Sequence, residues 1–582
     1  MRRFPSLVSV ALSAPLLLVV PLSGCDVLFS GTPTPMVQES SIHAVRLDTV
    51  GYINGRMKIA TVVLPAGMTT IATPTAEVRN ASTDAVVWPC DLIGPKTDPD
   101  TMAIYYIADF TAYAESGEFY VAVPGLVENG KSARSAKFRI APDVFRDPLT
   151  RAMIGLYGQR CGTAVSIKLD GNTWSHKICH QQDGFQDFLP AELRTATAKP
   201  SLHGWHDAGD YGKYTTNGAF TVGMMLHAWE RFKPTLNALS LPIPEHGGAI
   251  PDYLAEIKWE LDWLLTTQFS DGSVSFKVTA QSFEPNVLPE DDGARRFYTD
   301  VSTAAAGNLV AVLAQAARVY QPYDATLAAS YLEAARLSYA YLAATPLRHN
   351  PDLTGFGTGG YDAGSPDTDN RLWAAAEMWE TTGEAAFLTE FEGGAMSQPV
   401  RNNFDYDNVT NLGLFTYVLS ARAGRNQALV DSVTTAAIAS GDALVTTAQA
   451  AAFGRAIDGY WWGSNGSVVR TSINLWVAAL LNQVEAAKYQ DAIALQLDHV
   501  LGRNIYDRSY VTAMGLNPPS KPHHRPSVAD AVGAPWPGLL VGGPQPKATD
   551  WVDAVGNGSL NEIAVNWNGP LIYAFAALTP AP

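Results

Sequence analysis

Three acidic residues in two short polar stretches could carry out chemistry together. Asp207 and Asp210 lie in the segment Trp205-His206-Asp207-Ala208-Gly209-Asp210-Tyr211, and Glu562 follows Asn561 much later in the chain. Two aspartates at this spacing can point into one cleft, and a distant glutamate can face them. One carboxylate could then activate a water while another protonates a leaving oxygen, which is the chemistry of glycoside hydrolysis. The spacing alone is weak evidence, because most Asp-x-x-Asp pairs lie on the solvated surface.

The composition limits the class of protein. The chain has 582 residues, of which 47% are hydrophobic and only 16% are charged. Domains mostly span about 50–250 residues, so we expect two or more hydrophobic cores. The net charge of −16 argues against nucleic acid as a partner, because an acidic surface repels an anionic polymer. A neutral substrate is easier to accommodate.

Two sequence patterns indicate two domains. Residues 42–142 alternate apolar and polar positions in short runs such as Phe119-Tyr120-Val121-Ala122-Val123, which predicts a β-sandwich. Residues 143–582 show helical periodicity, with Leu254, Ile257 and Leu261 on one face. Further helices are expected at 304–320, 328–344, 372–381, 473–481 and 492–501. We expect an all-α array with no strand between the helices and no segment beyond the N-terminus that spans a membrane.

The N-terminus has the pattern of an export signal. Arg2 and Arg3 precede an apolar run that is short for a membrane span. The run ends in Leu22-Ser23-Gly24-Cys25, which resembles a bacterial lipobox and implies lipidation of Cys25. Residues 1–24 are therefore expected to be a lipoprotein signal peptide and residues 25–41 a linker. The expected location is membrane-anchored, in the periplasm or at the cell surface; an ordinary secretory signal is the alternative.

Three further cysteines are present, namely Cys90, Cys161 and Cys179. A disulfide between Cys161 and Cys179 is one interpretation, because exported chains often pair their thiols. However, His180 follows Cys179 directly, and His203 and His206 lie nearby. Two thiolates and two imidazoles are a tetrahedral zinc set, so the residues alone leave both alternatives open.

Several longer motifs resemble glycoside hydrolase family 9, in the group with an N-terminal immunoglobulin-like module. The resemblance runs from about Val45 to Ala577. In chain order it rests on Val50-Gly51-Tyr52, Gln159-Arg160-Cys161-Gly162, Trp205 to Tyr214, Asp300 to Ala305, Trp462-Gly463-Ser464-Asn465, Ser509 to Arg525 and Trp551 to Ala564. Gly558 and Gly569 depart from the family pattern, and we expect them to change the wall of a subsite.

The resemblance implies a fold and a mechanism. The fold is multidomain, an Ig-like β-sandwich followed by an all-α (α/α)6 barrel with its cleft at one end. The implied reaction is the inverting hydrolysis of β-1,4-glucosidic bonds in cellulose or a related β-glucan by an endoglucanase. Asp210 is implied as the general base, Asp207 as the residue that orients water, and Glu562 as the general acid. Glu562 needs a raised pKa to keep its proton, which apolar neighbours would supply.

The same resemblance implies residues that bind the substrate. His523 and Arg525 match substrate-contacting positions, and both can donate hydrogen bonds to sugar hydroxyls. The remaining candidates, mostly aromatic rings that could stack on sugar faces, are Tyr211, Trp461, Trp462, Trp551 and Asp553.

Two metals are implied as cofactors. A structural zinc would be held by Cys161, Cys179, His180 and His206, with His203 as the rival fourth ligand. A calcium ion is implied near residues 360–370, with Asp362, Asp369 and Asp407 as ligands, although Asn370 stands where an acidic residue is usual.

Two other functions remain open at this stage. One is an exo-acting cellodextrin or glucosamine hydrolase on the same scaffold, which loops that close the cleft would favour. The other is a non-catalytic carbohydrate-binding surface protein, against which the presence of all three acids argues. We expect a monomer that contacts the membrane only through its lipid anchor.

Overall fold

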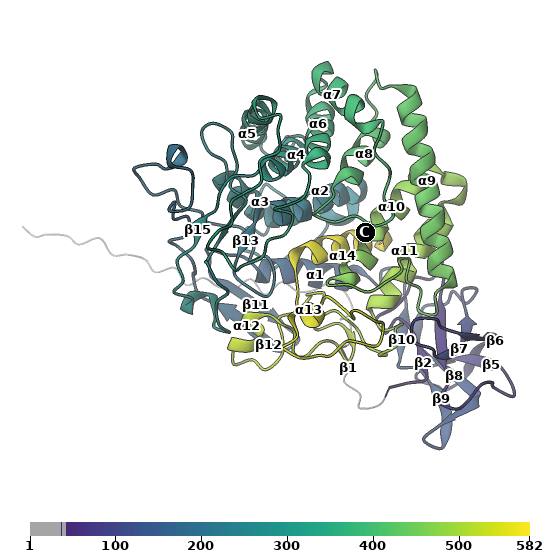
Figure 1. The fold of residues 1–582 in the computed structure, drawn as a ribbon. Helices are drawn as coiled ribbons and strands as arrows, with labels where there is room; N and C mark the ends of the chain where they lie inside the picture. The colour runs from purple at the N-terminus through teal and green to yellow at the C-terminus, as the bar shows by residue number, and fades with distance from the viewer. Residues whose placement is uncertain (1–35, 38–41) are drawn as a thin grey trace, which may run out of the picture.

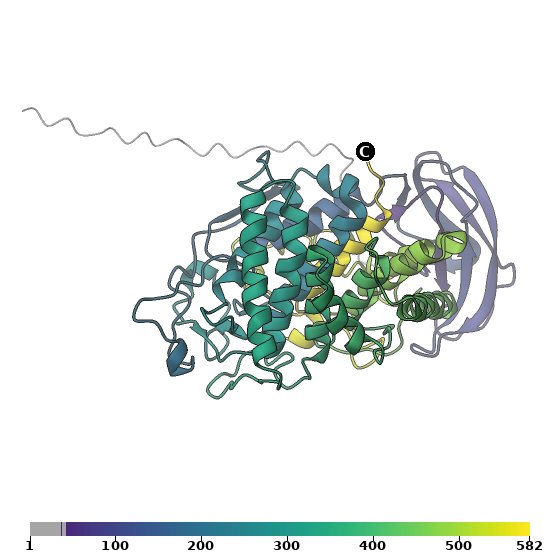
Figure 2. The ribbon, with the colours of Figure 1, turned by 90° about the horizontal axis from the view of Figure 1, so that it is seen from above.

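The structure is a computed structural model that describes residues 36–37 and 42–582 (Figure 1). The predicted signal peptide and Cys25 lie outside the described residues. Separate hydrophobic cores fill an N-terminal β-domain and a large helical domain, which confirms the predicted multidomain fold. Seen from above, the β-domain lies at one side of the helical domain, next to the helices of its C-terminal half (Figure 2).

The N-terminal domain is built of antiparallel strands, and one pair at the end of the strand order is parallel. Its strand order is β2-β4-β7-β6-β5-β8-β10-β3, with β9 paired to β8 and β10 parallel to β3. The strands are β2 (Val45–Arg46), β3 (Gly51–Tyr52), β4 (Ile59–Val63), β5 (Thr75–Asn80), β6 (Val86–Thr97), β7 (Ile104–Asp109), β8 (Gly117–Glu128), β9 (Lys131–Arg134) and β10 (Phe138–Ile140). Alternate residues of β8, such as Phe119, Val121 and Val123, point into the core, as the period of two predicts.

The helical domain is built in two layers. The helices are α1 (Arg146–Gly158), α2 (Thr215–Asn237), α3 (Asp252–Thr266), α4 (Thr303–Tyr320), α5 (Ala325–Ala344), α6 (Thr368–Thr382), α7 (Ala385–Ala395), α8 (Thr410–Leu419), α9 (Gln427–Ala450), α10 (Ser464–Leu481), α11 (Ala486–Val500), α12 (Arg525–Ala529), α13 (Gly558–Asn561) and α14 (Val565–Leu578), with 3-10 turns at η1 (Ala191–Leu193), η2 (Pro289–Asp291) and η3 (Gln483–Glu485). Inner helices α2, α4, α6, α8, α10 and α14 are buried along most of their length. Neighbours such as α5 and α9 bury only one face, so they form the outer layer.

The expectation of no strands among the helices is wrong. A hairpin is formed by β11 (Val165–Leu169) and β12 (Asn172–His176), and a small sheet by β13 (Lys213–Tyr214), β14 (Lys277–Thr279) and β15 (Phe297–Tyr298). In addition, β1 (Met36–Val37) lies parallel to β16 (Gly515–Leu516). Most of these strands are two or three residues long, which is too short to show a period of two in the sequence.

One described helix meets the length and composition of a membrane span, contrary to the expectation that none would. This is α9, whose apolar window has a mean hydropathy of 1.3. Its buried residues, among them Leu429, Val433 and Leu444, lie on the face that packs against α10 and α11. Alanine-rich composition, rather than a continuous run of large apolar side chains, accounts for its hydropathy.

Hydrogen bonds between polar groups join the two domains. The Thr49 N–H and hydroxyl both donate to the Leu501 carbonyl, at 3.1 and 2.6 Å. The Arg503 guanidinium donates to the Thr61 hydroxyl at 3.0 Å. The β-domain is therefore docked on the segment that follows α11.

Candidate active site

Three chain segments meet at the two aspartates. The Asp207 N–H donates to the Gly212 carbonyl at 3.0 Å, which folds the segment back on itself. On its other side, Ala208 forms a β-bridge with Ala564, just after Glu562. Gly209 permits a third approach, because a Cβ atom there would lie 2.2 Å from the His523 carbonyl oxygen. The segments that hold the predicted base, acid and histidine are thus in direct backbone contact.

Asp207 is buried and hydrogen-bonded through both carboxylate oxygens. Asn217 of α2 donates to Oδ1 at 2.6 Å, and the Tyr361 hydroxyl donates to Oδ2. Burial, and secondarily the charge of Asp210, raise the pKa of Asp207 to about 8. Sequence reasoning missed both partners, since neither stands in a motif that suggested a role, although Tyr361 lies in the stretch interpreted as a calcium site.

Asp210 lies on the wall of the cleft with only one of its oxygens engaged by the protein. Its Oδ2 accepts from the Gly212 N–H and from the Tyr214 hydroxyl, both at 3.0 Å. A carboxylate oxygen can accept two hydrogen bonds, so both donors are matched by Oδ2 alone. The arrangement leaves Oδ1 as the atom that could take a proton from a water.

Glu562 lines the same cleft as Asp210. Its backbone carbonyl accepts from the Gly542 N–H at 2.9 Å, and its backbone forms a parallel β-bridge with His523. Burial raises the pKa of Glu562 to about 8, and the charges of Asp210 and Asp207 add to the effect. A carboxyl with this pKa keeps its proton at neutral pH and can serve as a general acid.

The cleft is a cavity of about 770 Å³ with aromatic walls. The predicted rings Trp461 and Trp462 line it, and Trp462 is 54% exposed. Rings and polar groups that sequence reasoning did not anticipate also line it, namely Phe283, Tyr361, Tyr406, Arg401, Asp405 and Arg470. Trp567, expected beside Glu562 as an apolar neighbour, lines it as well. Aromatic rings beside hydrogen-bonding side chains suit a sugar, whose faces are apolar and whose rim carries hydroxyls.

Two of the predicted stacking residues lie elsewhere. Tyr211 is buried and donates its hydroxyl to the Val287 carbonyl. Trp551 is also buried, and its indole N–H donates to the Leu560 carbonyl at 3.2 Å. Neither ring is among the residues that line the cleft, and both are packed in the interior.

His523 and Arg525 line the cleft as expected. The His523 Nδ1 is 2.7 Å from the Val555 carbonyl, so this nitrogen carries the proton that is shared with the backbone. Arg525 is buried, and its Nη1 donates to the Gly209 carbonyl at 2.6 Å. Arg525 therefore donates to the backbone of the catalytic segment itself.

Asp553, predicted to contact the substrate, is placed away from the cleft lining. Its carboxylate accepts from the N–H groups of Ser520 and Lys521 at 2.8 and 2.9 Å, and from Asn561 Nδ2 at 2.9 Å. It thus ties the loop before His523 to the residue before Glu562. Of the two departures from the family pattern, Gly558 lines the cleft, whereas Gly569 lies in α14 against Thr221 and away from the cleft lining.

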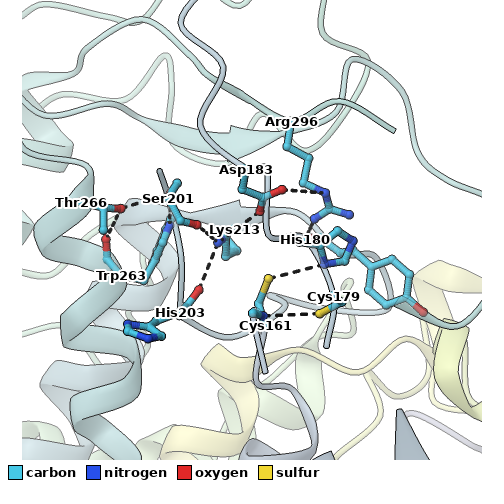
Figure 3. Close-up of polar contacts among 12 residues, drawn as sticks. Cys161, Cys179, His180, Asp183, Ser201, His203, Lys213, Trp263, Thr266 and Arg296 are labelled. Atoms are coloured by element: carbon cyan, nitrogen blue, oxygen red, sulfur yellow. Dashed lines mark hydrogen bonds and ion pairs between the residues drawn. The ribbon is translucent and has the colours of Figure 1, made fainter. Parts of the chain in front are cut away.

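The four predicted zinc ligands come together from three segments of the chain. Figure 3 shows three of them, Cys161, Cys179 and His180, side by side. His180 Nδ1 lies 3.5 Å from Cys161 Sγ and 3.3 Å from His206 Nε2, and Cys179 Sγ lies 4.0 Å from His206 Nε2. A tetrahedral zinc site has ligand–ligand edges of about 3.3–3.8 Å, given Zn–N and Zn–S bonds of about 2.0 and 2.3 Å. Both cysteines are free thiols in the structure, and their distances to the imidazoles favour the metal site over the disulfide.

The neighbours of this cluster also fit a metal site. The second nitrogen of His180 lies 3.3 Å from Asp292 Oδ2, an arrangement that orients metal-bound imidazoles in proteins. The rival ligand His203 is half-exposed, with its ring over Trp259 and apart from the sulfur atoms. Among the described residues, this is the one group of three or more Cys, His, Asp or Glu with ligand atoms within 4.8 Å of one another.

The predicted calcium ligands are less closely gathered. Asp362 accepts from the Thr216 hydroxyl at 2.7 Å, and Asp369 accepts from the Val409 N–H at 2.7 Å. Burial raises the pKa of Asp362 to about 7, and the charges of Asp369 and Asp407 add to it. Asp407 itself lines the cleft. The three carboxylates interact electrostatically, but their oxygen atoms are not gathered as closely as the ligand atoms of the cysteine and histidine cluster.

The fold and the site together define a class of protein, a barrel of paired helices in which an aspartate and a glutamate of raised pKa line one cleft, with a second aspartate buried beside them. Residues 145–575 match the family model described as Glycosyl hydrolase family 9, and residues 41–128 match the Cellulase N-terminal ig-like domain. The chain belongs to glycosyl hydrolase family 9 and is a glycoside hydrolase of the endoglucanase type.

Individual proteins are similar over most of their length. The chain is 42% identical to Endoglucanase D of Acetivibrio thermocellus over 91% of this chain and 83% of that protein. It is 32% identical to a Cellodextrinase of Butyrivibrio fibrisolvens, over 81% of this chain and 89% of the relative. The crystal structure of a metagenome-derived glycoside hydrolase family 9 endoglucanase superposes with a TM-score of 0.85 at 32% identity, over 92% and 99% of the two chains.

Proposed function

We propose that this enzyme cleaves internal β-1,4-glucosidic bonds of cellulose or a related β-glucan with inversion of configuration. The observation that carries the proposal is the position of Asp210 and Glu562 on the walls of one cleft. Glu562 has a pKa raised to about 8, whereas Asp210 accepts two hydrogen bonds as a carboxylate. A protonated acid and an ionised base are what a single displacement by water requires.

In this mechanism each acid has one task. Asp210 takes a proton from the attacking water through its free oxygen, and Asp207 helps to orient that water. Glu562 gives its proton to the glycosidic oxygen as the bond breaks. The exposed ring of Trp462 offers a platform for a glucose unit, while His523 and Arg525 meet hydroxyl groups on the cleft wall.

The alternative is an exo-acting cellodextrinase, which the similarity to the Butyrivibrio protein favours. Product analysis on a soluble mixed-linkage β-glucan, cellohexaose and chitosan oligomers separates the possibilities. An endo-acting glucanase lowers the viscosity of the polymer early and cleaves cellohexaose at internal bonds. Release of one short product at constant viscosity would favour exo action, and cleavage of chitosan oligomers alone would favour a glucosamine hydrolase.

We further propose that Cys161, Cys179, His180 and His206 hold a structural zinc ion. Four ligands close a tetrahedral site and leave no position for water, so the metal would take no part in the hydrolysis. His206 immediately precedes Asp207, and its N–H donates to the Gln159 carbonyl at 2.7 Å. The four ligands would thus hold the start of the catalytic segment.

Calcium and export stay as further proposals. Burial, and to a smaller degree the neighbouring aspartates, raise the pKa of Asp362 to about 7 and that of Asp369 to about 6, and a bound cation would stabilise both carboxylates. The lipobox-like segment before Cys25 supports export and lipid anchoring. Incorporation of labelled fatty acid, lost in Cys25→Ser, tests the anchor.

A further inference from the structure

One loop, residues 281–296, holds the residue that follows Asp210. Glu284 Oε1 accepts from the Tyr211 N–H at 2.6 Å. The Val287 carbonyl accepts from the Tyr211 hydroxyl, and the Arg296 guanidinium donates to the Tyr211 carbonyl. The backbone N–H, backbone carbonyl and side chain of Tyr211 are therefore all engaged by this loop.

Glu284 also pairs with Arg525. The Arg525 Nε lies 3.1 Å from Glu284 Oε1 and donates to the Glu284 carbonyl at 3.0 Å. Arg525 in turn donates to the Gly209 carbonyl from its backbone N–H at 3.2 Å and from Nη1 at 2.6 Å. Because Gly209 and Tyr211 are the two neighbours of Asp210, the Glu284–Arg525 pair holds the backbone on both sides of the base.

The carboxylate of Glu284 adds negative charge beside the base Asp210. Glu284 is buried, and burial together with the charge of Asp210 raises its pKa, while Arg525 and Arg296 oppose the increase. Buried charges are costly unless they are paired and hydrogen-bonded. Glu284 is paired with Arg525, and both residues accept from or donate to the catalytic segment. The preceding residue, Phe283, is 51% exposed on the cleft wall, so the same segment reaches both the cleft and the base.

We propose that Glu284 is a positioning residue of the hydrolysis, which orients Asp210 by holding Tyr211 and Arg525 without touching the substrate. The inference rests on the proposed role of Asp210 as the base. If Glu284 is lost, Gly209 and Tyr211 can shift, and Asp210 then meets the water at a poorer distance and angle. Misplacement of a catalytic group by about 1 Å can lower a rate by roughly 10²-fold.

The test compares Glu284→Ala and Glu284→Gln with Asp291→Asn, which removes an exposed carboxylate from the same loop. We expect Glu284→Ala to lower kcat on cellohexaose by roughly 10–10²-fold, with KM within about threefold of the parent enzyme and unfolding temperature little changed. Glu284→Gln keeps an oxygen that accepts from Tyr211 and Arg525, so it should retain more activity than the alanine variant. Asp291→Asn should behave as the parent enzyme.

Leaving-group dependence separates positioning of the base from other effects. On an aryl cellobioside with a good leaving group, which needs little help from the acid, the loss in Glu284→Ala should persist. The proposal would be overturned if Glu284→Ala recovered its rate on this substrate or had the kcat of the parent enzyme. It would also be overturned if the activity of Glu284→Gln fell only in step with a lowered unfolding temperature. Asp210→Asn is measured in parallel: if that variant stays active, the proposed function itself fails, whereas an inactive Asp210→Asn beside a fully active Glu284→Ala refutes the positioning role alone.

Discussion

The Val565 N–H donates a hydrogen bond to the Asp207 carbonyl at 2.8 Å. Val565 begins α14 three residues after Glu562, so this bond attaches the acid's segment to the segment that carries both aspartates. The bridge between Ala208 and Ala564 adds a second connection. The spacing between acid and base is therefore set by paired backbone rather than by flexible side chains.

Replacing the acid should separate proton transfer from the rest of the reaction. Glu562→Gln keeps the size of the side chain but has no proton to give, so turnover of cellohexaose should fall by roughly 10²–10⁴-fold. On an aryl cellobioside with a good leaving group the variant should recover much of its rate. Steady-state kinetics on both substrates checks this, and a variant that stays active on cellohexaose would refute the assignment.

The pH profile should have its alkaline limb at the pKa of Glu562. Burial and the nearby aspartates raise this pKa to about 8, and the acid works only while protonated. Activity should thus be retained up to about pH 8 and fall about tenfold per unit above it. Measurement of kcat/KM on cellohexaose across this range tests the prediction; an alkaline limb near the ordinary glutamate value of 4.5 would contradict it.

The stereochemistry of the first product reports on the base. Because Asp210 is expected to act through a water, the β-linked substrate should give the α-anomer before mutarotation. Proton NMR of the early reaction shows which anomer forms first. An initial β-anomer would mean a covalent intermediate and a different role for Asp210.

Zinc content and thiol counting test the metal site together. We expect about one zinc per chain and free thiols at Cys90, Cys161 and Cys179 after denaturation in a chelator. His180→Ala should lose the zinc and lower both activity and thermal stability, while the pH profile of the residual activity stays unchanged. His203→Ala, at the rival position, should keep the metal. A chain without zinc and with a single reactive thiol would instead establish a disulfide.

Two buried acids at the domain interface make stability depend on pH. Asp48 Oδ2 and both carboxylate oxygens of Asp498 have no hydrogen-bond partner among the described residues. Burial, eased by the charge of Arg503, raises the pKa of Asp498 to about 8, and burial with the charge of Asp498 raises the pKa of Asp48. Since these folded-state values exceed the ordinary 3.8, their stabilising contribution is complete below about pH 4 and is lost as the pH rises through about 8.

Asp48→Asn should therefore stabilise the protein at alkaline pH. Its amide oxygen can still accept from the Val50 and Gly51 N–H groups, and an amide carries no charge that Asp498 would repel. We expect the free energy of unfolding at about pH 8 to rise by about 1–3 kcal/mol, with little change near pH 4. Denaturant unfolding at both pH values checks this against the exposed control Asp91→Asn. An equal effect of Asp48→Asn at the two pH values would exclude titration of the pair as the cause.

Local patterns were sufficient for the parts of the molecule that depend on neighbours in sequence. Period-two runs predicted the β-domain, helical periodicity predicted helices such as α4 and α10, and long motifs pointed to Asp207, Asp210 and Glu562 as one site. The zinc candidates could be identified because thiols and imidazoles are uncommon and were close together in the chain. In these cases residue type alone limits the role that a side chain can have.

Tertiary structure decided which side chains support those residues. Tyr361, Asn217 and Glu284 reach the catalytic segment from a loop, a helix and another loop, and no spacing in the sequence relates them to it. The fold likewise turned Tyr211 inward and left Trp462 exposed, although both are aromatic residues in motifs. Sequence determined which groups could act as acid, base and metal ligand, because chemistry follows residue type. The approach of distant segments determined which of them touch, and so which carboxyl keeps its proton, because burial and neighbouring charge are properties of the folded chain.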